Sequence, residues 1–223
     1  MNANMTELVF ILDRSGSMGG LESDTIGGFN SMLAKQQAEP GECRITTILF
    51  DDRIETLHDR IDVRAVSPIS GKDYFVRGTT ALLDAVGSTI DRIVGVQKST
   101  ADSHRAGKVL FVITTDGMEN ASREFDYGKV KSMVERQKSK HGWEFIFLGA
   151  NIDAVEVAGR FGIGRNRAQT FHNDSEGIEL NYETISETVM AFRAAPAGAP
   201  ISDCWNARVD NDYKGRKAKQ PRQ

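Results

Sequence analysis

The stretch Leu8-Val9-Phe10-Ile11-Leu12-Asp13-Arg14-Ser15-Gly16-Ser17 decides the fold of this chain. Residues 8–12 form a short, unbroken apolar run, which is typical of a parallel strand that is covered on both faces. The residues that follow are polar, and Gly16 allows a tight turn. In open α/β sheets, ligands bind beyond the carboxyl ends of the strands. We therefore expect a buried strand that carries a polar loop to a binding site.

Strand-like and helix-like segments alternate along the rest of the chain. Apolar runs predict strands near 43–50, 54–57, 109–115, 145–148 and 168–171. Apolar residues at helical spacing predict helices near 21–37, 80–97, 127–140, 155–161 and 178–192. This alternation indicates a doubly wound α/β fold, in which helices cover both faces of an open, mostly parallel sheet. The segment 54–57 follows a turn and is expected to return as one antiparallel edge strand.

The character of the sequence changes after Ala194. Proline, alanine and glycine become frequent, and the end of the chain, 214–223, is basic and lacks apolar periodicity. Such a segment gains little by packing against a core. We therefore expect one domain over residues 1–195 and an extended, basic, flexible tail over 196–223.

Composition and charge exclude several classes of protein. The chain has 223 residues, of which 39% are hydrophobic and 26% charged, and its net charge of −3 does not favour a polyanion-binding molecule. Its two cysteines, Cys43 and Cys204, form neither a disulfide framework nor a metal knuckle. We find no signal-peptide pattern and no run of the roughly 20 apolar residues that a membrane span needs. These features favour a cytoplasmic protein without a membrane partner.

Oxygen-bearing side chains gather where the predicted strands end. Asp13, Ser15 and Ser17 follow the first strand at alternating positions, Asp116 ends the strand near 109–115, and Thr80 opens a helix. Carboxylates and hydroxyls are hard ligands that suit Mg²⁺, and also Mn²⁺ or Ca²⁺, better than zinc. We therefore predict a divalent-metal site. From the residues alone, either the Thr79 or the Thr80 hydroxyl could face the ion.

The same residues resemble the motifs of the von Willebrand factor A domain family. Asp13-Arg14-Ser15-Gly16-Ser17 resembles its D-x-S-x-S signature, Gly78-Thr79-Thr80-Ala81-Leu82 its G-[GT]-T-x-L segment, and Thr114-Thr115-Asp116-Gly117 its T-D-G segment. The three motifs occur in the family's order and cover the chain from about residue 6 to residue 195. The resemblance implies a metal-ion-dependent adhesion site, or MIDAS, with these ligands: Asp13, Ser15, Ser17, Thr80 and, often through water, Asp116. Phe29-Asn30, Phe50-Asp51-Asp52 and the segment 80–85 are also similar to small stand-alone bacterial and phage members.

The expected site carries little negative charge, and this suggests what it does. Two carboxylates and three hydroxyls leave a divalent ion electrophilic, and its open position would accept an acidic side chain. We therefore expect a protein-interaction module and not an enzyme, with an unidentified partner protein that offers Asp or Glu. The rim that meets this partner is expected to include Arg14 and Met18, which should point outward, and also Gly78, Thr79, Gly117, Met118 and Glu119.

Other interpretations remain open at this point. The segment from Asp13 to Ser17 could be a plain turn whose hydroxyls cap the next helix, and Thr80 could serve only as a helix N-cap. Asp116 could simply cap the turn that follows it. A carboxylate-held metal could also serve a phosphoester hydrolase. Against that activity, we find no placed base or phosphate clamp, and Ser15 stands where an Asp-x-Asp phosphatase needs its second acid. The basic tail could contact nucleic acid, but a solvated tail is the favoured interpretation.

Overall fold

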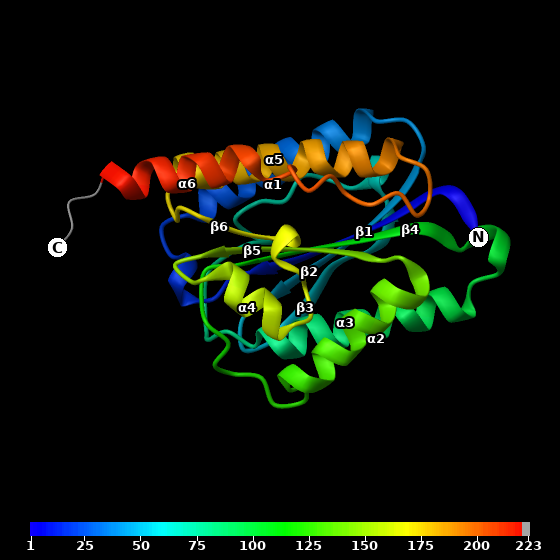
Figure 1. Cartoon of the computed structure of the whole chain (residues 1–223), viewed down its shortest axis with the longest axis horizontal. Coiled ribbons are helices and arrows are strands. Elements are labelled where there is room, and N and C mark those ends of the chain that lie inside the picture. Colours follow the sequence, from blue (N-terminus) through cyan, green and yellow to red (C-terminus); the bar gives the residue numbers. More distant parts are fainter. Residues whose placement is uncertain (220–223) are drawn as a thin grey trace.

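The computed structural model describes residues 1–219 and shows a sheet flanked by helices on both faces (Figure 1). The sheet has six strands in the order β3-β2-β1-β4-β5-β6. Only the pairing of β2 with β3 is antiparallel, and it lies at one edge. The expectation of a doubly wound, mostly parallel sheet with one antiparallel edge strand is therefore confirmed. The strands are β1 (Asn2–Asp13), β2 (Glu42–Phe50), β3 (Ile54–Asp62), β4 (Ala106–Thr115), β5 (Glu144–Ala150) and β6 (Ala168–Phe171).

The helices lie in two layers. In Figure 1, α2, α3 and α4 cover one face of the sheet, and α1, α5 and α6 cover the other. Their bounds are α1 (Glu22–Ala38), α2 (Leu82–Ser99), α3 (Tyr127–His141), α4 (Ala154–Arg160), α5 (Ser175–Ala194) and α6 (Ala207–Lys219). Short 3-10 turns occupy Gly16–Met18, Val63–Ala65, Asp102–His104 and Arg165–Arg167.

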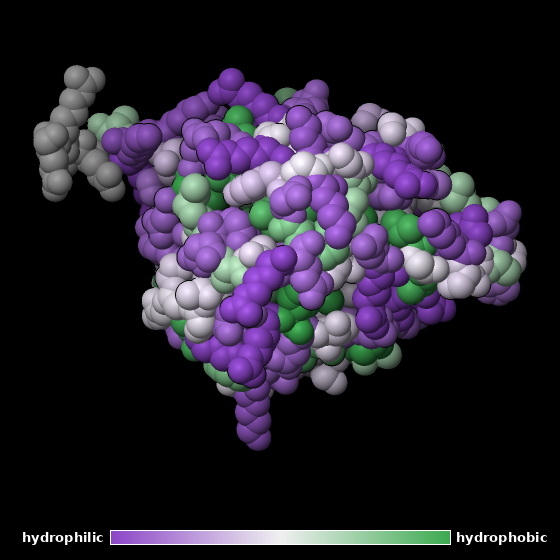
Figure 2. All heavy atoms as spheres, turned by 90° about the horizontal axis from the view of Figure 1, so that it is seen from below, coloured by the Kyte–Doolittle hydropathy of each residue, from purple (hydrophilic) through white to green (hydrophobic). Residues whose placement is uncertain are grey.

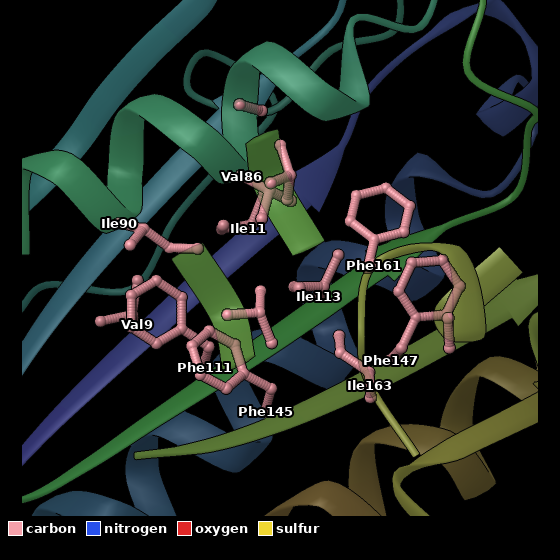
Figure 3. Close-up of a cluster of buried hydrophobic side chains, with 14 of the residues drawn as sticks. Val9, Ile11, Val86, Ile90, Phe111, Ile113, Phe145, Phe147, Phe161 and Ile163 are labelled. Atoms are coloured by element: carbon pink, nitrogen blue, oxygen red, sulfur yellow. The ribbon is translucent and has the colours of Figure 1, made fainter. Parts of the chain in front are cut away.

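The unbroken apolar run of β1 is explained by its two buried faces. Side chains alternate along a strand, so Val9 and Ile11 pack with α2, α3 and α4 (Figure 3), whereas Leu8, Phe10 and Leu12 pack with α1 and α5. All five side chains are at most 2% exposed. The strand β4 repeats this alternation beside β1. The two central strands therefore form a rigid base from which their carboxyl-end loops project.

The C-terminal segment differs from the extended tail that we expected. Residues 207–219 form α6, which packs against β6 and α5. Ile201 and Val209 are buried with the α1 and α5 side of the core, and Arg216 pairs with Asp174 at the start of α5. The expectation is therefore wrong for this part of the chain, because two well-placed apolar residues anchor it without producing a periodic pattern. Residues 220–223 lie outside the described part.

The surface on the side of α2, α3 and α4 is mostly hydrophilic, with hydrophobic side chains in small, separate patches (Figure 2). Over residues 1–219, the structure holds no helix with the length and hydropathy needed to cross a membrane.

Candidate metal centre

The predicted metal ligands lie at the point where the strand order of the sheet reverses. The first strand, β1, pairs with β2 on one side and with β4 on the other. In a doubly wound sheet, this reversal opens a crevice at the carboxyl ends of the two central strands. Asp13 ends β1, and Asp116 directly follows β4. The topology alone therefore brings these two carboxylates to one crevice.

Hydroxyls and carboxylates form a connected network in this crevice. The Ser15 and Ser17 hydroxyl oxygens lie 3.2 Å apart, and the Ser17 hydroxyl donates to Asp116 Oδ1 at 2.5 Å. Asp13 Oδ1 accepts the Ser15 backbone N–H at 2.7 Å. On the other side, Asp13 Oδ2 accepts the Thr115 hydroxyl at 2.5 Å. The structure thus brings together residues that are 99 and 102 positions apart in the sequence.

Thr80 completes this cluster, and its hydroxyl does not cap the helix that follows. The N-cap position of α2 is Ala81, and the first turn is served from elsewhere: Leu83 N–H donates to Glu119 and Asp84 N–H to Ser122. The Thr80 side chain is buried, whereas Thr79 is exposed. A Cβ on Gly117 would lie 3.2 Å from Thr80 Oγ1 and 3.4 Å from Ser17 Oγ. The geometry therefore places the Thr80 hydroxyl, and not that of Thr79, beside the other candidate ligands.

Backbone hydrogen bonds hold the three motif loops against one another. Gly16 N–H donates to the Gly78 carbonyl at 3.2 Å, and Arg77 N–H donates to the Arg14 carbonyl at 2.9 Å. Thr80 N–H donates to Asn120 Oδ1 at 2.9 Å, and the Thr80 carbonyl accepts the Asn120 N–H at 3.0 Å. The positions of the side chains thus rest on local backbone contacts as well as on the sheet.

The electrostatics of the crevice favour a cation. Asp13 and Asp116 are each only 2% exposed. Burial raises the pKa of Asp13 above its usual range, and burial together with the nearby charge of Asp13 raises the pKa of Asp116 to about 6. No basic side chain within residues 1–218 forms an ion pair with either carboxylate. Buried charges are ordinarily paired or coordinate metals, so these residues fit a divalent ion.

The donor set also limits how such an ion is held. Within the described residues, no group of three or more His, Cys, Asp or Glu side chains is placed to hold a metal. A site built on Asp13 and Asp116 therefore depends on the hydroxyls of Ser15, Ser17 and Thr80.

Two residues of the expected rim are buried. Arg14 is 0% exposed and Met18 is 4% exposed, so the expectation that they point outward is wrong. Because side chains alternate, the residue after Asp13 turns to the opposite side, where Arg14 meets Asp51 at the end of β2. Met18 turns inward from the short 3-10 turn that begins at Gly16.

The other rim residues differ in their surroundings. Gly78, Thr79 and Met118 are exposed, and Gly117 is half-buried. The Glu119 carboxylate instead accepts backbone N–H groups of Leu83, Ala121 and Ser122. It therefore joins the loop after β4 to the start of α2, which is a structural role that the rim expectation did not include.

Three contacts of the cluster were missed by the sequence reasoning. Thr115 bonds Asp13, the Tyr74 hydroxyl donates to the Asp13 carbonyl at 2.5 Å, and Asn173 Nδ2 lies 3.3 Å from Asp116 Oδ2. The contact of Thr115 could have been predicted, because this residue stands inside the Thr114-Thr115-Asp116-Gly117 motif. Tyr74 and Asn173 come from irregular segments, and no pattern in the sequence indicates their contacts.

Comparison with known proteins identifies the fold. No protein-family model matches the sequence, and no curated protein matches it. Solved structures do: a von Willebrand factor type A protein from Catenulispora acidiphila has a TM-score of 0.56 at 11% identity, over 84% of this chain and 43% of its own. The pilus adhesin SpaC from Lactobacillus rhamnosus GG has a TM-score of 0.62 at 11% identity, over 86% of this chain and 31% of its own.

A third similar structure holds a metal. Proximal thread matrix protein 1 from the mussel byssus, with a zinc-occupied MIDAS motif, has a TM-score of 0.55 at 13% identity, over 84% of this chain and 46% of its own. This chain therefore spans less than half the length of the proteins it matches here. At these identities the similarity shows the fold alone. The chain has the von Willebrand factor type A fold, as its three motifs predicted.

Proposed function

We propose that this protein is a metal-dependent protein-binding module. One observation carries the proposal: Asp13 and Asp116 are buried, have no cationic partner among the described residues, and are surrounded by hydroxyls at the crevice of the sheet. A divalent ion, when bound, would offer an electrophilic coordination position to an acidic side chain of a partner protein. Asp13, Ser15, Ser17, Thr80 and Asp116 are the residues that would hold it.

The choice of ion belongs to the proposal. Oxygen-only ligands favour Mg²⁺, with Mn²⁺ or Ca²⁺ as alternatives. The mussel protein holds zinc in its MIDAS motif, so the preference of hydroxyls for harder ions does not remove zinc from consideration. Zn²⁺ should therefore be tested alongside the other three.

A role in binding is favoured over phosphoester hydrolysis. Arg14 lies nearest to the candidate ligands in sequence, but its guanidinium is buried against Asp51 and is not available to clamp a phosphate. Asp116 accepts the Ser17 hydroxyl, and Ser15 replaces the second acid of an Asp-x-Asp pair. Two basic residues of the last helix are also engaged, since Lys214 pairs with Asp210 and Arg216 with Asp212. The nucleic-acid alternative therefore gains no support from the described residues.

The partner is sought by affinity capture with a matched pair of variants. Tagged wild-type protein, Thr80→Val and Thr79→Val are incubated with a cell extract in Mg²⁺ or Mn²⁺, and again in EDTA. We expect a partner that binds wild type and Thr79→Val, but that is lost in EDTA and with Thr80→Val. Replacing one partner Asp or Glu by its amide should then abolish binding. Capture that persists in EDTA and with Thr80→Val would refute the proposal.

A further inference from the structure

The last helix, α6, is linked to the candidate metal centre by a short segment of chain. In Figure 1, α6 lies along α5, and its end lies on the side of the molecule opposite the N-terminus. The linking segment is 172–174, which joins β6 to α5. Asn173, in the middle of this segment, donates from Nδ2 to Asp116 Oδ2 at 3.3 Å. A residue between β6 and α5 therefore contacts a candidate metal ligand directly.

This hydrogen bond helps to fix the direction of the Asp116 carboxylate. The Ser17 hydroxyl donates to Oδ1 at 2.5 Å and Asn173 donates to Oδ2, so both oxygens are oriented by donors. An ionised carboxylate offers about four lone-pair sites, so these bonds leave room for an ion or for its bound water. Removing a donor that orients a metal ligand typically lowers metal affinity about 10–100-fold. Asn173 thus has the geometry of a residue that orients a ligand.

The direction of the Asn173 amide depends on the backbone around it. Its Oδ1 atom is buried without a hydrogen-bond partner, and within residues 1–218 the bond to Asp116 is the only hydrogen bond of this side chain. The first turn of α5 supports the backbone on one side, because Asp174 Oδ1 accepts the Gly177 N–H at 2.8 Å. Gly177 also leaves no room for a Cβ beside the His172 carbonyl, so the two segments are in close contact.

The last turns of α6 support the same segment from the other side. Arg216 Nη1 donates to Asp174 Oδ2 at 2.7 Å, and the Arg216 side chain is only 25% exposed. The rings of Tyr213 and His172 lie 4.8 Å apart, and the Tyr213 carbonyl oxygen lies 3.3 Å from His172 Nε2. The residues on both sides of Asn173 are therefore held by α6.

We propose that Asn173 is a positioning residue of the metal centre, and that docking of α6, through Arg216 and Tyr213, holds it in place. This inference rests on the proposed function, because it requires that Asp116 helps to bind a divalent cation. It makes the last helix part of the site, although that helix supplies no ligand. A chain with a loosened α6 should keep all of its candidate ligands and yet bind the ion more weakly.

The metal alone is the probe for the first test. Mn²⁺ is titrated into the full chain by isothermal calorimetry, with wild type and with Asn173→Ala. We expect the affinity of Asn173→Ala to be lower by about tenfold or more. Asn211→Ala makes the same chemical change at an exposed residue of α6 and should leave the affinity unchanged. Circular dichroism establishes that each variant is folded.

A second pair of variants tests the role of α6. Arg216→Gln should weaken Mn²⁺ binding about fivefold, at the low end of typical coupling between sites. Lys214→Gln removes the same charge from the same helix but should not weaken binding, because Lys214 pairs with Asp210 inside α6. The loss of a positive charge would by itself raise the affinity for a cation, so a weaker affinity cannot come from charge alone. Arg216→Lys retains the charge and should keep most of the affinity.

The double variant decides whether Arg216 acts through Asn173. In that case, the combination of Asn173→Ala with Arg216→Gln should bind Mn²⁺ no more weakly than Asn173→Ala alone. Additive losses in the double variant, or wild-type affinity in both single variants, would overturn this inference and leave the proposed function intact. A wild-type chain that binds none of Mg²⁺, Mn²⁺, Ca²⁺ and Zn²⁺ would instead refute the proposed function and this inference with it.

Discussion

Arg14 and Asp51 form an ion pair in which both side chains are 0% exposed and Arg14 Nε lies 2.9 Å from Asp51 Oδ2. The pair joins the residue after β1 to the residue after β2. The same carboxylate oxygen accepts Arg77 Nε at 2.7 Å. Burial alone would raise the pKa of Asp51, but the hydrogen bond from Arg77 and the charge of Arg14 lower it overall. One carboxylate therefore fixes two of the loops that surround the candidate metal centre.

The first prediction concerns this carboxylate. Asp51→Asn retains the shape of the side chain but removes the only fully buried carboxylate that pairs with Arg14 in the described part of the chain, so we expect a loss of about 3–5 kcal/mol in the free energy of unfolding. Glu55→Gln removes the other carboxylate that contacts Arg14, but Glu55 is 49% exposed, so the loss should be at most about 1 kcal/mol. Urea unfolding in EDTA measures both. Similar losses for the two variants would contradict this account of the pair.

The second prediction separates the two adjacent threonines. With a metal bound only by the folded state, unfolding should cost about 2.7 kcal/mol more at a free concentration 100 times the dissociation constant. Thr80→Val removes a buried hydroxyl beside Ser17 and Gly117, so most of this gain should disappear. Thr79→Val changes an exposed residue, so this variant should retain the stability gained from the metal. Melting with Mg²⁺, Mn²⁺, Ca²⁺, Zn²⁺ or EDTA tests both variants; a gain that Thr80→Val retains in full would remove this residue from the ligand set.

The third prediction concerns how the free energy of unfolding changes with pH, and how a bound metal opposes this change. Burial raises the pKa of Asp116 from its usual 3.8 to about 6. A raised carboxyl pKa favours the folded state while the group is protonated, so this stability is present below the unfolded pKa and is lost as pH rises through about 6. In EDTA, the free energy of unfolding should therefore fall between about pH 4 and 6. The gain from Mg²⁺ should grow over the same interval, because the metal competes with the proton.

Asp116→Asn is the control for this pH profile. The amide does not titrate, so the EDTA profile of this variant should be flatter than that of the wild type. The gain from Mg²⁺ should also be smaller at every pH. A wild-type profile in EDTA that rises between pH 4 and 6, unaltered by the substitution, would show that other groups dominate.

The sequence predicted the elements better than it predicted their contacts. The apolar runs of β1 and β4 located the sheet, and the motifs at Asp13, Thr80 and Asp116 located the crevice, because the carboxyl ends of parallel strands meet at one edge. The inward direction of the Arg14 side chain could not be predicted in the same way. Its burial depends on Asp51, 37 residues away, which no local pattern links to it. The anchoring of α6 through Val209 likewise depends on tertiary packing.

The fourth prediction tests the packing of α1 against α5 with two adjacent glycines. A Cβ on Gly28 would overlap the ring of Tyr182, with 2.7 Å to its Cγ atom, whereas a Cβ on Gly27 has no neighbour within 4 Å. Gly28→Ala should therefore cost about 1–3 kcal/mol through overpacking against a buried ring. Gly27→Ala should instead stabilise the chain by about 0.5–1 kcal/mol, because alanine restricts the unfolded state and favours the helix. Urea unfolding compares the two alanines in the same helix. Helix propensity alone would affect both alanine variants alike, so it cannot produce this contrast. A destabilised Gly27→Ala or a stabilised Gly28→Ala would show that α1 and α5 do not pack as described.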